Sequence, residues 1–232
     1  MKVEVKHIEG YAFGAIQPSA VIAFSDFTSE VDKLATQLSN LIDGLPTLED
    51  TQRFFGDDSL FQQNSAPALF VTIIDILNRH CGDLRFSPIK VFREDGSICF
   101  AVPTLSPAMI TANSQAVHLL MPKFIKGMTN EQLMKFMDDL KKRGRGFLPG
   151  GTNAGNFIAA AAERKIPFKI FNRRYIIFGY GSGSRIFNSS ITDEESAIGV
   201  SLAKSKVDTN RLLKMSGIPV AEQARVRTVD DA

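Results

Sequence analysis

The stretch from residue 129 to residue 220 constrains the fold most strongly, because its periodicity changes several times between clear breaks. It predicts a helix, a Pro-Gly-Gly break at 149–151, a second helix, strands around a glycine-rich turn, and two final helices. Helices that alternate with strands are typical of an α/β arrangement. We therefore expect an α/β protein, in which an N-terminal α+β region precedes this stretch.

The first helix of the stretch begins with a capping box. The Thr129 side chain can accept a hydrogen bond from the backbone three residues later, and the Gln132 side chain can accept one in return. Apolar residues then recur at helical spacing to about residue 140. A basic cluster at 141–145 follows, where positive charge stabilises the end of a helix. Helix stability alone thus explains part of this basic charge.

Two shorter helices are predicted after residue 190. Thr192–Glu195 has the pattern of a second capping box, and Asp208 is predicted to cap the helix that follows. Lys206 falls in the connection between these two helices. The apolar side chains that the first of them should bury are Ala197, Ile198 and Leu202.

The glycine-rich segment 179–184 can be interpreted as a phosphate-binding loop or as a hairpin turn. The dinucleotide-binding fingerprint needs a glycine at its sixth position, where this chain has Ser184, and a helix that starts within the loop. Residues 185–187 resume an extended pattern instead. We therefore predict a hairpin turn.

Residues 1–128 predict an α+β region without recognisable chemistry. Two short strands are expected within residues 1–24, and helices over about 28–43 and 67–81. Asp95-Gly96 between two apolar strands is a strong hairpin signal. The segment 108–120 could be a short helix or a strand followed by a helix.

Composition excludes several classes of function. The two cysteines, Cys81 and Cys99, are too few for a disulfide framework, and no histidine or cysteine pair has zinc spacing. We therefore predict no metal site, and no residue stands out as catalytic. No apolar run is long enough for a membrane helix, and the N-terminus lacks the apolar core of a signal peptide. A cytoplasmic protein without a membrane partner is expected.

Charge is distributed unevenly along the chain. Residues 121–185 carry 13 basic and 4 acidic side chains, a balance of +9, whereas residues 1–60 have a balance of −6. An anionic partner is one explanation and a solvated face is the simpler one. Arg173, Arg174 and Arg185 are the candidate contacts to an anionic substrate. Because few aromatic residues are interleaved with the basic ones, nucleic acid is an unlikely partner.

Three pieces of the stretch, in this order, resemble one family of enzymes. They are AAAERKIP at 160–167, FGYG at 178–181, and the spaced series TD, SAI, K, T, LL and GIPV between 192 and 220. The stretch is similar to the region just ahead of the ATP-binding module in cyanophycin-synthetase-like ATP-grasp ligases. This resemblance covers about residues 129–222.

The resemblance implies a pre-ATP-grasp α/β region at 129–220 after a variable region at 1–128. Such enzymes use ATP to convert a carboxylate into an acyl phosphate, which an amine captures as an amide. ATP and Mg²⁺ are thus the implied cofactors of the complete enzyme, and an amino acid or peptide is its implied substrate. The N-terminal part would hold the acceptor and form one wall of the ATP cleft.

The resemblance also implies what this chain lacks. Residues 221–232 look like the truncated start of the ATP-grasp module, so we expect the catalytic module to be absent and to be the partner of this chain. The chain alone should then be inactive and bind no cofactor tightly. Lys206 matches the lysine of the family's Asp-Lys pair and is the candidate nucleotide contact, although Ser205 replaces the aspartate.

Three alternatives stay open. Lys206 can be an ordinary solvent-facing lysine. The chain can be a stand-alone binding module for an anionic polymer or nucleic acid through its basic 121–185 surface. It can also be a scaffold, including a homo-oligomer.

Overall fold

The computed structural model describes residues 3–8, 11–24, 66–223 and 226. The helix expected over 28–43 lies outside the described residues. The described elements are β1 (Val3–Ile8), β2 (Ser19–Phe24), α3 (Ala66–His80), β3 (Lys90–Glu94), β4 (Ser97–Pro103), α4 (Pro107–Ile125), α5 (Asn130–Gly144), α6 (Thr152–Glu163), β5 (Phe168–Ile170), β6 (Tyr175–Phe178), η2 (Gly181–Gly183), β7 (Arg185–Asn188), β8 (Ile191–Thr192), α7 (Ala197–Lys204) and α8 (Lys206–Met215). This mixture of helices and strands confirms the expected α/β class.

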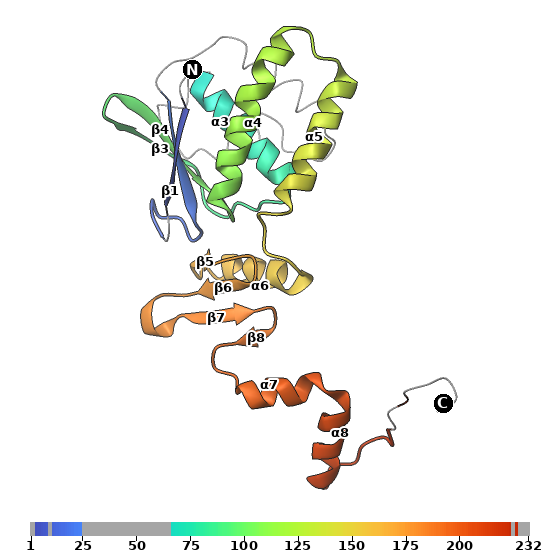
Figure 1. Ribbon diagram of the computed structural model, residues 1–232. Helices are drawn as coiled ribbons and strands as arrows, with labels where there is room; N and C mark the ends of the chain where they lie inside the picture. The colour runs from blue at the N-terminus through green and yellow to red at the C-terminus, as the bar shows by residue number, and fades with distance from the viewer. Residues whose placement is uncertain (1–2, 9–10, 25–65, 224–225, 227–232) are drawn as a thin grey trace.

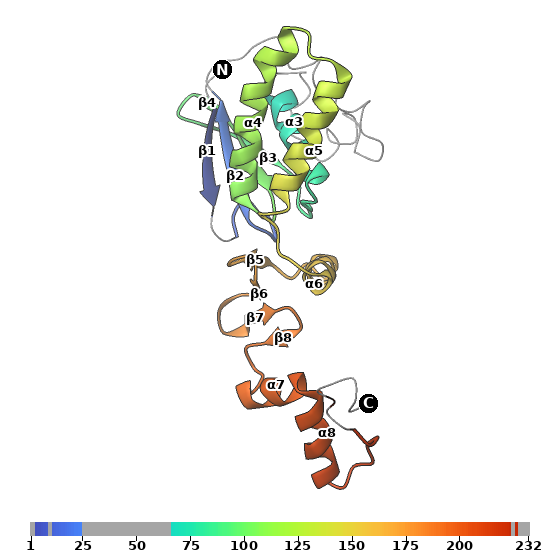
Figure 2. The same cartoon turned by 45° about the vertical axis from the view of Figure 1, so that its right-hand side comes forward.

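The first unit, from β1 to α5, is an antiparallel sheet with three helices on one face (Figures 1 and 2). Its strand order is β1-β2-β4-β3. Alternate apolar residues of β2 and β4 point toward the helices, because successive side chains of a strand face opposite sides of the sheet. The largest fully buried side chains of this core are Phe24, Phe70, Phe100, Ile22, Ile73, Ile74 and Leu77.

Two local predictions for the first unit can be checked directly. The hairpin between β3 and β4 turns at Asp95 and Gly96, whose φ angles of 48° and 77° are those of the left-handed region that this turn requires. The prediction of a hairpin is therefore confirmed. The ambiguous segment after it is one helix, α4, which runs through Pro122.

The capping box of α5 is confirmed as well. The Thr129 hydroxyl accepts from the Gln132 backbone N–H at 3.3 Å, and the Gln132 side chain accepts from the Thr129 backbone N–H at 3.0 Å. α5 buries Leu133, Met137 and Leu140 in the core of the first unit. This helix thus shares the core of the preceding residues, although the expected domain boundary lay at its start.

The second unit, from α6 to β8, is a smaller antiparallel sheet of order β5-β6-β7-β8 with α6 on one face (Figure 2). Its core consists of Ala154, Ile158, Ala161, Phe168 and Ile176, and Leu105 of the first unit packs into this core. Hydrogen bonds between described residues also join the two units. The Phe168 backbone N–H donates to the Ile16 carbonyl at 2.7 Å, and the Tyr11 hydroxyl donates to the Gly179 carbonyl at 3.0 Å.

The arm, formed by α7 and α8, projects beyond the second unit in both views (Figures 1 and 2). Neither helix contains a buried residue. The expectation that α7 buries Ala197, Ile198 and Leu202 is therefore wrong: Ala197 is exposed, Leu202 is only partly buried, and the Ile198 side chain is 75% exposed. The Thr209 hydroxyl donates to the Leu202 carbonyl at 2.7 Å and ties the two helices together.

Both predicted N-caps of the arm helices are also wrong. Thr192 lies in β8, paired with Phe187, so that it cannot start a helix, and Ser196 caps α7 instead. Ser205, not Asp208, caps α8: its hydroxyl accepts from the Asp208 backbone N–H at 3.2 Å. Serine is as good an N-cap as aspartate, and the earlier of the two sets the helix start.

Candidate functional site

The three arginines proposed to contact substrate do not form one cluster. In the antiparallel pair of β6 and β7, Tyr175 lies opposite Asn188 and Phe178 opposite Arg185. Arg173 and Arg174 immediately precede β6, whereas Arg185 lies beside its last residue. The antiparallel register therefore places Arg185 at one end of β6 and the other two arginines at the opposite end.

Arg173 and Arg174 belong to a tight turn between β5 and β6. The Asn172 side-chain carbonyl accepts from the backbone N–H groups of Arg174 at 2.8 Å and of Tyr175 at 3.0 Å. Such a side-chain contact fixes the backbone of a turn. The Arg173 carbonyl accepts from the Gly150 N–H at 3.4 Å, which brings this turn next to the segment that follows α5.

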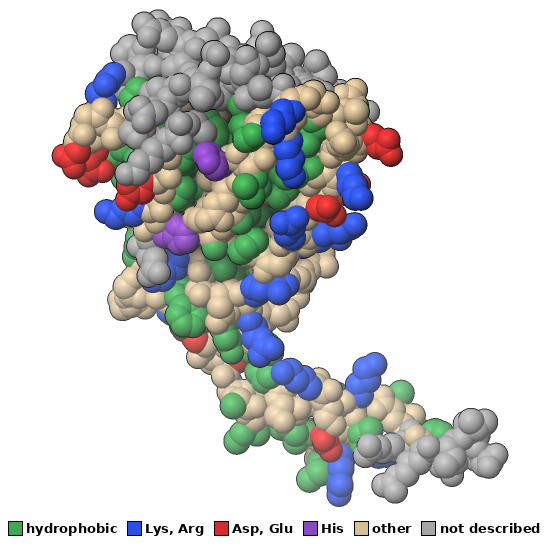
Figure 3. Space-filling view, turned by 45° about the horizontal axis from the view of Figure 1, so that its top comes forward, with side chains coloured by type: hydrophobic (Ala, Val, Ile, Leu, Met, Phe, Trp, Pro, Cys, Tyr) green, Lys and Arg blue, Asp and Glu red, His purple; other side chains and the backbone are tan. Residues whose placement is uncertain are grey.

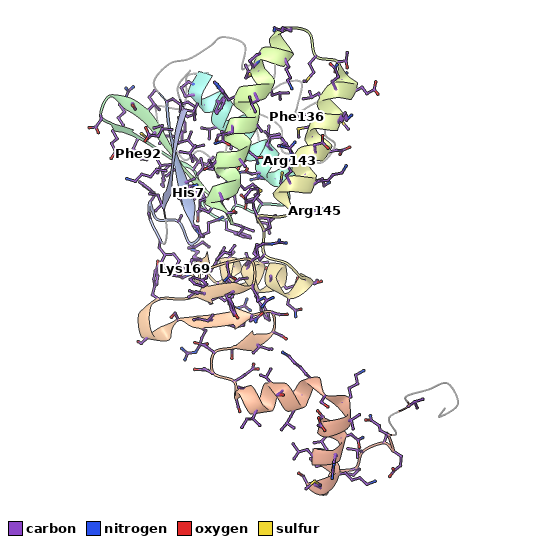
Figure 4. All side chains as sticks on the ribbon, in the orientation of Figure 1. His7, Phe92, Phe136, Arg143, Arg145 and Lys169 are labelled. Atoms are coloured by element: carbon purple, nitrogen blue, oxygen red, sulfur yellow. The ribbon has the colours of Figure 1, made fainter. Side chains whose placement is uncertain are left out.

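Exposed basic side chains lie on both sides of this junction, and we call this set the basic seam. Its members are Lys141, Lys142, Arg143, Arg145, Lys169, Arg173 and Arg174. Lysine and arginine side chains gather along α5 and continue toward the second unit (Figure 3). Arg143 and Arg145 lie at the end of α5, and Lys169 lies on β5 (Figure 4). Within the described part of the chain, none of the seven forms an ion pair.

Lys206 is exposed, but it is the first residue of α8 and not, as predicted, part of the connection between the two helices, because Ser205 caps α8. Lys206 lines an open pocket of about 340 Å³ together with Thr209, Asn210 and Gln223. The Asn210 amide donates to the Ala221 carbonyl at 2.8 Å and holds the following segment against α8. Because the start of a helix carries partial positive charge, Lys206 adds to a field that attracts anions.

A second pocket, which the sequence did not predict, lies between α6 and the β6–β7 hairpin. It measures about 370 Å³, and Arg164 and Arg185 contribute to its lining. Its aromatic walls are Phe157, Phe178 and Phe187. The spacing of these three phenylalanines in the sequence gives no signal for the pocket, because they come from three elements.

Two buried acids, Asp75 in α3 and Asp83 shortly after it, were not predicted by any sequence pattern. Asp83 accepts from the Thr104 hydroxyl at 2.5 Å and from the Leu105 N–H at 2.7 Å. Burial raises the pKa of the Asp83 carboxyl to about 7, although these hydrogen bonds lower it. Asp75 is paired with Arg85 at 3.0 Å and with Arg79 at 3.3 Å. Burial raises the pKa of Asp75 too, against the effect of both arginines.

Among the residues that the structure describes, no group of three or more histidine, cysteine or acidic side chains could hold a metal ion. Cys81 and Cys99 are both free and buried. No described helix combines the length and the apolar character that crossing a bilayer requires.

Comparison with known proteins gives one consistent similarity. Over 82 residues, 35% of this chain, the sequence is 32% identical to the cyanophycin synthetases of Trichormus variabilis and of a Nostoc species. Over 101 residues, 43% of the chain, it is 28% identical to the cyanophycin synthetase of a Synechocystis species. The chain contains a cyanophycin-synthetase-like region.

This cyanophycin-synthetase-like region corresponds to a small part of its relatives. The matched segments span 9% of the Trichormus and Nostoc proteins and 12% of the Synechocystis protein. No family model matches the chain. The activity of the whole relatives therefore enters only as a proposal.

Proposed function

We propose that this chain is the N-terminal part of an ATP-dependent ligase that joins a carboxylate to an amine of an amino acid or peptide. In this role it holds the acceptor and forms one wall of the ATP cleft, in the cytoplasm. The observation that carries the proposal is the similarity to cyanophycin synthetases. The order of the family's motifs within residues 129–222 supports it.

The arm supports a role next to further polypeptide. Ile198 and Met215 are 75% and 78% exposed, and Val207, Leu212 and Ile218 are also exposed. Covering such apolar surface is favourable by roughly 25 cal/mol per Å². A downstream ATP-grasp module that packs on the arm would gain this energy and would bring its nucleotide close to Lys206.

Lys206 is the residue that we propose to contact the nucleotide. Its ammonium group can donate to a phosphate oxygen as a mobile point charge. Mg²⁺ prefers carboxylate oxygens, and the described residues offer no acidic cluster for it. We propose no magnesium ligand among the described residues.

The basic seam is the proposed acceptor surface. Its seven cations come from α5, the segment after α5, β5 and the β5–β6 turn, and the Asn172 contacts hold that turn in place. Arg185 lies at the other end of β6, so its proposed contact with substrate would be separate from those of Arg173 and Arg174.

Co-sedimentation with insoluble cyanophycin at physiological salt tests the acceptor role. We expect the wild-type chain to co-sediment and the Arg173→Ala/Arg174→Ala variant to bind about fivefold more weakly, since exposed charge contacts contribute roughly 0.2–1 kcal/mol each. The Lys204→Ala/Arg211→Ala variant carries the same charge change on the arm and should bind like the wild type. Absence of wild-type binding would refute the acceptor role.

The alternative is a stand-alone binding module for an anionic polymer or nucleic acid. The charge of the basic seam favours it, because seven exposed cations suit any polyanion. Adding mixed-sequence DNA to the co-sedimentation assay separates the two functions. DNA that displaces the chain from cyanophycin at equal mass, with a steep dependence on salt, would favour the alternative.

A further inference from the structure

The pocket between α6 and the β6–β7 hairpin has walls suited to an apolar group. The Phe187 ring packs edge-on against Phe157 and Phe178, with ring centroids 5.1 Å apart in each pair. Ala160 lines the α6 side, and its small side chain leaves space beside the rings. The volume of about 370 Å³ lies within the range of about 300–1,000 Å³ that is usual for small-molecule sites.

The backbone holds both guanidinium groups in the pocket lining. The Arg185 Nη1 donates to the Ser184 carbonyl at 2.8 Å and to the Ser182 carbonyl at 3.4 Å. The Arg164 Nη1 donates to the Ala160 carbonyl at 3.0 Å. A guanidinium that is already oriented loses less conformational entropy when a ligand binds.

The contact with Glu194 shows that the Arg185 guanidinium can bind a carboxylate. The Glu194 carboxylate oxygen Oε1 lies 2.6 Å from the Arg185 Nη2. The Glu194 side chain is 65% exposed, and such exposed pairs contribute little to stability. Arg164 has a longer contact, 3.9 Å, with Glu163, which is more exposed than Glu194. A ligand carboxylate can therefore replace the Glu194 carboxylate at low cost.

We propose that this pocket binds a small amphiphilic carboxylate. The apolar body of the ligand, an aromatic ring or a branched chain, lies against Phe157, Phe178 and Phe187. Its carboxylate is bound by Arg164 and Arg185 and displaces Glu194. The proposal uses neither Lys206 nor the basic seam and shares only Arg185 with the proposed ligase function, so this pocket can bind its ligand even if the chain holds no acceptor.

Calorimetric titration of the whole chain with 3-phenylpropionate tests this site. We expect 3-phenylpropionate to bind at least tenfold more tightly than 3-phenylpropanol, which lacks the charge, and than acetate, which lacks the ring. Ala160→Leu should reduce the affinity by tenfold or more, because the larger side chain fills the pocket. Unchanged chemical shifts of core methyl groups outside the pocket would show that this variant is folded.

Three charge variants make the test specific. Arg185→Gln should weaken binding about tenfold, whereas Glu194→Gln should strengthen it several-fold, because it removes the competing carboxylate. Arg173→Gln has the same charge change at the opposite end of β6 and should leave the affinity unchanged. Equal affinity for the acid and the alcohol, or equal effects of Arg173→Gln and Arg185→Gln, would overturn the proposal.

Discussion

Replacing Gly144 with alanine should destabilise the first unit. Gly144 ends α5 and is buried against Cys81, at the end of α3. An alanine Cβ would lie 2.4 Å from the Cys81 Cβ and 2.5 Å from its Sγ. Rotation of the cysteine side chain moves the Sγ but not the Cβ, so that the two helices must separate to relieve the contact.

The expected loss follows from two opposing effects. Overpacking in a core costs about 1–3 kcal/mol. Alanine gains roughly 0.5–1 kcal/mol over glycine inside a helix, but Gly144 is the last helical residue and would gain less. We expect the unfolding free energy to fall by about 2 kcal/mol, which corresponds to a decrease in Tm of about 5 °C for a chain of this length.

Urea denaturation followed by circular dichroism measures this loss. Gly155→Ala in α6 is the matched control, because nothing lies within 4 Å of the Cβ that it adds. The control variant should be as stable as the wild type or slightly more stable. Equal stability of the two variants would show that α5 does not approach α3 as closely as described. The position of the basic residues at the end of α5 would then be wrong as well.

Two further predictions concern titration and the nucleotide. Because the pKa of Asp83 is raised, the folded chain binds more protons than the unfolded chain between about pH 4 and 7. The free energy of unfolding should therefore fall as pH rises through this window, by up to roughly 4 kcal/mol. Urea denaturation at several pH values should show a smaller fall for Asp83→Asn, and equal slopes would contradict the burial of this carboxyl. In the complete enzyme, Lys206→Ala should raise the KM for ATP about tenfold, since it removes a charge-assisted contact of roughly 1.5–3 kcal/mol. The Tm of the isolated chain should not change, and a lower Tm with an unchanged KM would make Lys206 a structural residue.

Short sequence patterns correctly predicted the elements whose hydrogen bonds join residues close together in the chain. The Thr129 box and the Asp95-Gly96 turn form as expected, because each needs only residues within a few positions. The Thr192 box has the same pattern, and the Thr192 N–H does approach the Glu195 carboxylate, at 3.4 Å. Pairing of Thr192 with Phe187 in the sheet prevents a helix there. This competing partner is five residues earlier in the chain and cannot be inferred from the capping pattern.

The candidate site was predictable only in part. The sequence identified the basic charge of residues 121–185, and most of these side chains are exposed. The separation of Arg173 from Arg185 depends on the register of β6 and β7, which the glycine-rich turn alone does not fix. The prediction that Ile198 is buried failed for a different reason. Apolar periodicity shows that a helix has an apolar face, but it does not show what covers that face.

Acceptor binding and nucleotide binding should be separable in this chain. Most of the basic seam belongs to α5 and to the β5–β6 turn, which are held by the core of the first unit and by the Asn172 contacts. Lys206 instead lies on an arm without a buried residue, where the alignment of α7 and α8 depends on contacts such as the Thr209 bond. The basic seam is held in place and can bind at full strength without additional polypeptide. A contact from Lys206 instead requires the apolar face of the arm to be covered first. The isolated chain should therefore retain affinity for the acceptor while binding ATP weakly.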